Sequence, residues 1–179
     1  MSNSKLVSYT GLSHNHSGKR TCAISRITPH AVVGQLSVER ICDCFKDRGR
    51  QASCNYAIGA DGRIGLCVDE QNRSWCSSSR DNDQRAVTIE CASDLTNPYA
   101  MKPEVYSALV ELCVDICRRN RKKRLVWIAD RDKALTYTVK SDEILLTVHR
   151  WFAIKSCPGN WLFGKLGDFA QAVNSRLGK

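Results

Sequence analysis

The sequence predicts a single α/β domain in which a mixed central β-sheet is flanked by helices. Three observations favour this class. Short runs rich in β-branched and apolar residues alternate along the chain with longer segments of helical periodicity. An Asp-Gly pair at residues 61–62 separates two strand-like runs and indicates a hairpin. The length of 179 residues suits one domain, and no internal repeat, low-complexity tract or interdomain linker divides it.

Residues 1–21 are polar and rich in Ser, Asn and Gly. We therefore expect a polar N-terminal segment over 1–21, followed by one folded domain over 22–179. His14 and His16 lie in this segment without an acidic or sulfur neighbour, so they are expected in a surface loop rather than at a metal.

The remaining periodic segments follow in chain order. Strands are expected over 22–30, 52–59, 63–68, 85–92, 125–129 and 144–148, and helices over 37–46, 103–119 and 161–177. Pro29 should mark the end of the first strand or an irregularity in it. Ser37 is a suitable N-cap for the first helix. The strand over 125–129 is expected to be a central strand of the sheet. Residues 70–84 and 130–142 are expected to be polar connecting segments.

The chain is basic, with a formal net charge of +9 and a sequence pI near 9.2. Such a charge indicates an anionic partner, which can be nucleic acid, a membrane surface or an anionic cell-wall polymer. The densest basic run, 118–124, is typical of a solvated helix end, and no aromatic residue interleaves it as a nucleic-acid site would require. We expect neither nucleic acid nor membrane as a partner, because the apolar runs are also too short to span a bilayer.

The cysteine pattern points away from disulfides and zinc knuckles. Ten cysteines are present, but no CxxC pair occurs, and the first residues lack the apolar core of a signal peptide. We therefore expect synthesis in the cytoplasm, where thiols stay reduced. Most of the cysteines are then small buried hydrophobes. Cys157 is the exception, because the reactive side chains of His149 and Lys155 lie close to it in the sequence.

The stretch over 147–159 places an imidazole, an ammonium and a thiol within nine residues, directly after an apolar run that enters the core. His149 and Cys157 are half of a zinc site, and His30, at another predicted strand end, is the candidate third ligand. Three protein ligands leave one position of Zn²⁺ for water, which is the pattern of a catalytic rather than a structural site. The reaction class is then hydrolysis.

Two more residues fit a hydrolytic site. Glu90 lies late in a β-branched strand, where a carboxylate is either exposed or functional, and it can take a proton from water. Lys155, two residues before Cys157, can offset negative charge on a tetrahedral intermediate. Trp75 lies in a serine-rich loop, where it either covers the edge of the core or faces a ligand.

These residues resemble the zinc amidase family that includes phage lysozyme-type amidases and peptidoglycan recognition proteins, from about residue 22 to the C-terminus. The matching segments are His30, 54–62, 74–76, 86–90, 147–149 and 155–158. The His-x7-Cys spacing with Lys two residues before Cys is the specific part. Among the branches of the family, endolysins of phages of Gram-positive bacteria match best.

The resemblance implies an amidase-2-like fold and an N-acetylmuramoyl-L-alanine amidase, which cuts the amide bond between N-acetylmuramic acid and the first L-alanine of the stem peptide in bacterial peptidoglycan. By this resemblance His30, His149 and Cys157 bind Zn²⁺, and Glu90 and Lys155 are catalytic. The expected substrate-binding residues are Asn55, Tyr56 and Trp75.

One position departs from the family pattern. Members that use a catalytic tyrosine carry it, followed by histidine, at the start of the hairpin strand, whereas this chain has Cys54 and Asn55 there. Tyr56 shares a face with Cys54 and can line the cleft, but a catalytic role is not expected of it.

Two other functions compete with the amidase. A binding module of the same fold would recognise peptidoglycan without cutting it, although such modules tend to lack a zinc ligand. A nucleic-acid-binding protein would use the net charge. For the amidase the same charge would hold the enzyme on anionic wall polymers, and a leaderless enzyme would reach the wall through a holin-type route.

Overall fold

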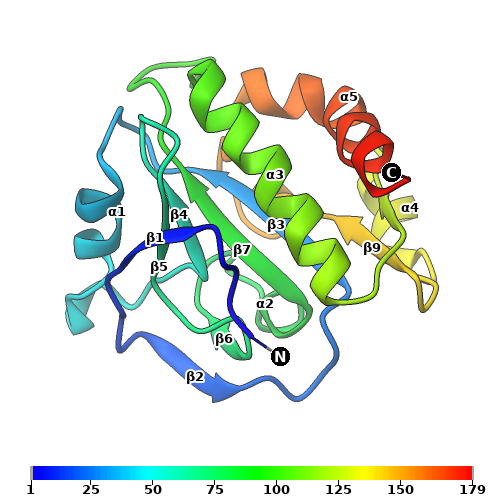
Figure 1. Cartoon of the computed structure of the whole chain (residues 1–179), viewed down its shortest axis with the longest axis horizontal. Helices are drawn as coiled ribbons and strands as arrows, with labels where there is room; N and C mark the ends of the chain where they lie inside the picture. The colour runs from blue at the N-terminus through cyan, green and yellow to red at the C-terminus, as the bar shows by residue number, and fades with distance from the viewer. Residues whose placement is uncertain (1, 179) are drawn as a thin grey trace.

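The computed structural model describes residues 2–178 and contains one seven-stranded sheet (Figure 1). From edge to edge its strands are β1 (Val7–Thr10), β5 (Ile64–Leu66), β4 (Tyr56–Ile58), β7 (Ala86–Cys91), β3 (Arg26–Ala31), β9 (Glu143–Leu146) and β8 (Arg124–Val126). The β4–β5 hairpin is antiparallel, as the Asp-Gly turn predicted, and every other pair in this sheet is parallel. The predicted mixed sheet is confirmed.

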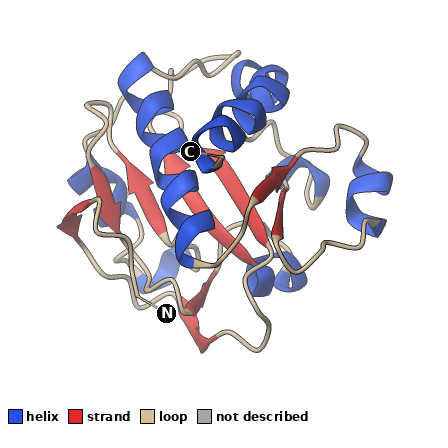
Figure 2. Cartoon of the chain, turned by 45° about the vertical axis from the view of Figure 1, so that its right-hand side comes forward, coloured by secondary structure: helices blue, strands red, loops and turns tan. Residues whose placement is uncertain are grey.

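Helices cover the sheet (Figure 2). They are α1 (Val38–Cys44), α2 (Arg80–Arg85), α3 (Pro103–Arg119), α4 (Arg131–Thr136) and α5 (Asn160–Leu177), with 3₁₀ turns η1 (Arg48–Arg50) and η2 (His149–Trp151). The long helices α3 and α5 lie side by side across one face of the sheet (Figure 1). Within the described residues, no helix has the length and apolarity needed to cross a membrane.

Sequence periodicity placed both long helices correctly. Pro103 starts α3 in the first turn, where a missing N–H leaves no hydrogen bond unmade. The apolar stripe of α5 packs into the core through Leu162, Leu166, Phe169, Ala170 and Val173. The short helices α2 and α4 were not predicted, because one or two turns of polar residues show no amphipathic period.

The N-terminal segment forms part of the sheet system. β1 pairs in parallel with β5 at one edge, and β2 (His16–Lys19) pairs with β6 (Asn72–Ser74) in a separate two-stranded sheet. The expectation of a loop at His16 was therefore wrong, whereas His14 lies in an exposed loop. Each of these two N-terminal strands has four residues that alternate between half-buried and exposed, so their side chains form no apolar run.

Pro29 lies inside β3 rather than at its end, paired with Ile89 of β7. Pro29 instead affects the pairing of β3 with its other neighbouring strand, β9. The register between β3 and β9 ends at the pair Ile27–Leu146. Proline has no N–H with which to continue that ladder. The backbone ladder between β3 and β9 therefore ends just before His30 and His149.

β8 is an edge strand, so the prediction of a central strand over 125–129 was wrong. Its residues Leu125 and Val126 are apolar because they are buried where α5 packs against the strand. The side-chain amide of Asn174 on α5 accepts a hydrogen bond from the Leu125 N–H (2.7 Å) and donates one to the Leu125 carbonyl (2.9 Å). One helix side chain thus satisfies backbone groups that an edge strand otherwise leaves open.

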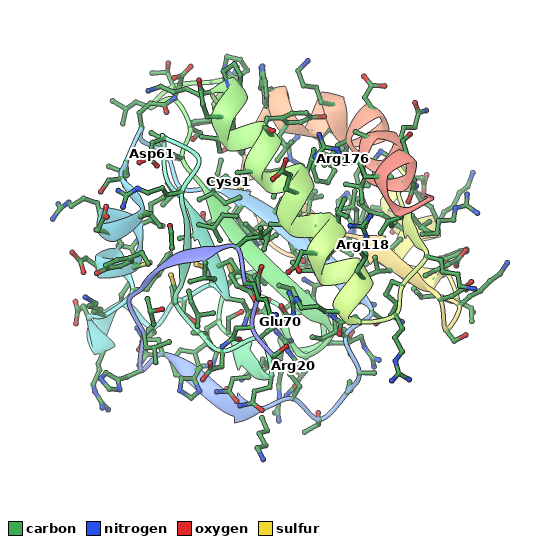
Figure 3. All side chains as sticks on the ribbon, viewed as in Figure 1. Arg20, Asp61, Glu70, Cys91, Arg118 and Arg176 are labelled. Carbon is green, nitrogen blue, oxygen red and sulfur yellow. The ribbon has the colours of Figure 1, made fainter. Side chains whose placement is uncertain are left out.

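A buried ion-pair network connects the N-terminal segment to α3. Glu70 is fully buried, and its carboxylate accepts hydrogen bonds from the hydroxyl of Tyr56, the guanidinium of Arg119 and the amide of Asn120 at 2.7–3.1 Å. Arg20 donates to the Glu70 carbonyl (2.8 Å), and the two residues lie near the C-terminal end of α3 (Figure 3). Burial of these charges is tolerated because each is paired.

Candidate active site

Four of the residues singled out from the sequence converge at the carboxyl end of the central strands. β3 and β7 run in parallel, and their register pairs His30 directly with Glu90. β9 runs parallel to β3, so the segment that follows it delivers His149 to the same end. The loop after η2 then folds back and brings Cys157 against His30. The ends of β3 and β7, the segment after β9 and the loop after η2 thus build the site from parts far apart in the chain.

The donor atoms of His30, His149 and Cys157 all lie within 4.8 Å of one another. The Cys157 Sγ is 3.3 Å from the His30 Nδ1, and the two imidazole rings have centroids 5.0 Å apart. Glu90 stands at the rim of this group, with its Oε1 4.0 Å from the His30 Nδ1. Two imidazoles and a thiol at this spacing are a ligand set that zinc prefers.

Two polar atoms of this cluster are buried without any partner in the described structure: the Nε2 of His30 and the Oε2 of Glu90. Burial lowers the pKa of His30, and the His149 ring lowers it further. Burial also raises the pKa of the Cys157 thiol, and it raises the pKa of Glu90 to about 7. Neutral imidazoles are ready to bind a metal, and a cation is what such a buried thiol needs to ionise. The residues present therefore fit zinc.

A fully hydrogen-bonded layer holds the ligand-bearing segments in place. The hydroxyls of Thr28 and Thr147, each two residues before a histidine of the site, lie 2.7 Å apart. The side-chain amide of Asn82 donates to Thr28 and accepts from Thr147, both at 3.0 Å. Asn82 also donates to the Ser77 hydroxyl (3.1 Å). These four side chains are completely buried, so they fix the spacing of the strands that carry the histidines.

A cleft of about 520 Å³ opens beside the cluster. Its lining residues are Gln51, Ala52, Arg73, Trp75, Cys76, Ser78, Ser79, Arg80, Asp83, His149 and Lys155. Trp75 is half-buried in this wall, with its indole N–H donated to the Ser17 hydroxyl (2.7 Å). Lys155 is exposed. The pKa of His149 is lowered first by the burial of its ring and second by the positive charge of Lys155. Trp75 and Lys155, both singled out from the sequence, thus line the same cleft as His149.

Asn55 and Tyr56 do not reach this cleft, and their predicted substrate-binding role is not supported by their positions. Both side chains are completely buried. The Asn55 side chain bonds the backbone carbonyls of Val68, Asp69 and Asn72 and accepts from the Thr88 N–H. The Tyr56 hydroxyl belongs to the Glu70 network. Strand alternation placed Tyr56 on the same face of the strand as Cys54, but it could not show that this face is buried and that the Tyr56 hydroxyl contacts Glu70.

Sequence reasoning missed two residues that touch the cluster. The Ser78 hydroxyl lies 2.9 Å from the Nε2 of His149, and Ser78 has a positive φ of 61°. The Cys76 Sγ is 3.8 Å from the Oε1 of Glu90. Their position directly after Trp75 was the one available signal, since a serine-rich loop carries no periodicity that separates functional from solvated residues.

Comparison with known proteins gives one family and one fold. Residues 14–160 match the family described as N-acetylmuramoyl-L-alanine amidase. No curated protein matches the chain by sequence.

Solved structures share the fold at low sequence identity. A mutant endolysin from Bacillus subtilis is 12% identical with a TM-score of 0.63, over 92% of this chain and 97% of that one. An N-acetylmuramoyl-L-alanine amidase from Clostridium intestinale is 16% identical with a TM-score of 0.59, over 94% and 97%. The hydrolase AmiA of Staphylococcus aureus, solved with its ligand, is 12% identical with a TM-score of 0.62, over 94% and 82%.

Proposed function

The chain belongs to the N-acetylmuramoyl-L-alanine amidase family and is a peptidoglycan amidase, and from this premise we propose that His30, His149 and Cys157 hold its catalytic zinc. The observation that carries the proposal is the convergence of these three donors beside two buried polar atoms that lack a partner. The scissile bond is the amide between N-acetylmuramic acid and L-alanine.

Bound zinc supplies a Lewis acid and lowers the pKa of a coordinated water. The protein residues supply the rest of the reaction. Glu90 has one free carboxylate oxygen and a pKa near neutrality, so it accepts a proton from water and returns it to the leaving amine. Lys155 lines the cleft, and in this proposal its ammonium offsets the negative charge that develops on the carbonyl oxygen. Trp75 offers an apolar wall for the sugar or peptide.

Elemental analysis of the purified protein, with and without Cys157→Ser, tests the metal assignment. We expect about one zinc per wild-type chain and a large loss in the variant, together with loss of cell-wall clearing. Cys44→Ser is the matched control, because it makes the same change at a half-buried thiol of α1. Unchanged zinc content in Cys157→Ser would contradict the ligand set.

The competing function is recognition of peptidoglycan without cleavage. It predicts a protein that binds purified walls but releases no stem peptides, even when loaded with zinc. The presence of all three candidate ligands together with Glu90 favours the enzyme. Release of free amino groups from walls by the wild type decides between the two.

We propose in addition that the protein acts as an endolysin and is held on anionic wall polymers by its charge. The fold shared with endolysins supports the first part, and a holin-type route would then bring it to the wall. For the second part, a groove of about 430 Å³ carries four cationic side chains, Arg26, Arg85, Lys122 and Lys140, against one acid, Asp81. It lies at the opposite end of β3 from His30, so a polymer held there leaves the cleft open.

Wall sedimentation at increasing salt tests this surface. We expect Lys122→Glu/Lys140→Glu to bind anionic walls several-fold more weakly than wild type at low salt, with a smaller dependence on salt. Lys5→Glu/Lys19→Glu is the control, since it changes the net charge equally at exposed positions elsewhere. Equal weakening by both pairs would show that overall charge, not this groove, binds the polymer.

A further inference from the structure

Two thiols in the core lie unusually close together, and neither belongs to the cluster of candidate zinc ligands. The Sγ atoms of Cys42 and Cys67 are 3.1 Å apart, and both side chains are completely buried. Cys42 is on α1, and Cys67 directly follows β5. The sulfur atoms need to approach by only about 1 Å to reach the disulfide bond length of about 2.05 Å.

The backbone around the pair is packed to bring α1 this close. A Cβ atom at Gly65 would lie 2.9 Å from the Cys42 Sγ, and one at Gly11 would lie 2.8 Å from the Cys42 Cβ. Only glycine therefore fits at these two positions without moving the helix. The contact between Cys42 and Cys67 is maintained by the chain on both sides of it, rather than by side-chain rotation alone.

We propose that Cys42 and Cys67 form a disulfide when the protein leaves a reducing compartment for an oxidising one. A peroxide can serve as the oxidant, since it is small enough to enter a core that opens transiently. It oxidises one thiol to a sulfenic acid and releases one water; the sulfur of the second thiol then displaces the hydroxyl, which leaves as a second water. Two thiols and one hydrogen peroxide give one disulfide and two waters.

The bond would tether a wall of the catalytic cleft. Between residues 42 and 67 the chain passes through η1 and through Gln51 and Ala52, which line the cleft. A crosslink that closes this loop stabilises the fold mainly by restricting the unfolded chain. The adjacent Cys67 thiol and burial raise the pKa of the Cys42 thiol, so we expect the oxidation to be slow.

A third thiol makes the pairing testable. The Cys54 thiol is also completely buried and is one of the causes of the raised pKa of Cys67, so a Cys54–Cys67 bond is the competing product. These three thiols are not a metal site, since in the described part of the chain three donor atoms converge only around His30.

The experiment treats the full-length protein with dilute hydrogen peroxide and digests it with trypsin without reduction. Cleavage after Lys and Arg places Cys42 in peptide 41–46, Cys54 in 51–63 and Cys67 in 64–73. We expect mass spectrometry to find 41–46 joined to 64–73, with fragmentation assigning the bond to Cys42 rather than Cys44. A 51–63 to 64–73 product, or no linked peptide in oxidised but folded protein, would overturn the proposal.

Thermal unfolding provides a second measurement. Oxidation should raise the unfolding midpoint of the wild type and of Cys44→Ala by several degrees, and reduction should reverse the change. Cys42→Ala should show no such rise. If it unfolds too readily to be measured, the peptide map of the wild type still decides the question. Because neither thiol touches the zinc ligands, failure of this proposal would leave the amidase assignment intact.

Discussion

Two buried carboxylates in this protein have opposite surroundings. Glu70 is completely buried, and both of its oxygens accept hydrogen bonds from Arg119 as well as from uncharged donors. Glu90 is 13% exposed, but its Oε2 has no partner in the described structure, and its nearest contacts are a thiol at 3.8 Å and an imidazole nitrogen at 4.0 Å.

The difference separates a group that stabilises the fold from one that is available for chemistry. A buried charge is strongly unfavourable unless it is paired, so the satisfied Glu70 contributes to folding, and the unsatisfied Glu90 is tolerated at the expense of stability. The number of hydrogen-bond partners, rather than burial alone, distinguishes the Glu70 carboxylate from the Glu90 carboxylate.

The largest expected effect is on catalysis at Glu90. Glu90→Gln keeps the shape of the side chain but removes the proton acceptor, so we expect hydrolysis of peptidoglycan to fall by roughly 10²–10⁴-fold. Its thermal stability and zinc content should stay near those of the wild type. A variant that unfolds more readily would show that Glu90, like Glu70, supports the fold.

Glu70→Gln should give the reverse pattern. It removes the buried carboxylate that pairs with Arg119 and leaves that guanidinium with Asp115 as a carboxylate partner; breaking a buried pair costs up to about 3–5 kcal/mol of unfolding free energy. Urea unfolding measures this loss. Activity per folded molecule should not change, since Glu70 lies outside the cleft. A selective fall in kcat would refute the structural role.

The smallest of the three effects is expected for Tyr56→Phe, which removes the 2.7 Å hydrogen bond to Glu70. A hydrogen bond to a charged group is worth about 1.5–3 kcal/mol, and that is the expected loss of stability. KM for wall fragments should be unchanged. A raised KM with normal stability would restore the substrate-binding role first predicted for Tyr56.

The candidate zinc ligands and Glu90 could be singled out from the sequence because most of the signal that marks them is local, and the structure brings their side chains together. His149 and Cys157 share one short stretch, and Glu90 stands out in an apolar strand. His30 was chosen as the third candidate ligand because it also lies at a predicted strand end, and the ends of neighbouring parallel strands lie close together. The hairpin and the two long helices likewise follow from turn chemistry and apolar periodicity.

The rest depended on contacts that no local pattern contains. The burial of Asn55 and Tyr56 is set by Arg20 and Glu70, which come from two other segments. Strand β1 is held by its parallel partner β5, more than fifty residues away in the chain. Ser78 reaches His149 across 71 residues. Sequence spacing carries no information on such distant pairs.

The edge position of β8 has a consequence for self-association. An open sheet edge can add a strand from another molecule, which is a common start of aggregation. Here the edge strand has three residues, Asn174 occupies hydrogen-bonding groups of its Leu125, and the four cations at 121–124 lie just before it or at its first residue. Two molecules approaching through this edge would meet like charges and occupied backbone groups. The basic run therefore also keeps copies of the protein apart at high concentration.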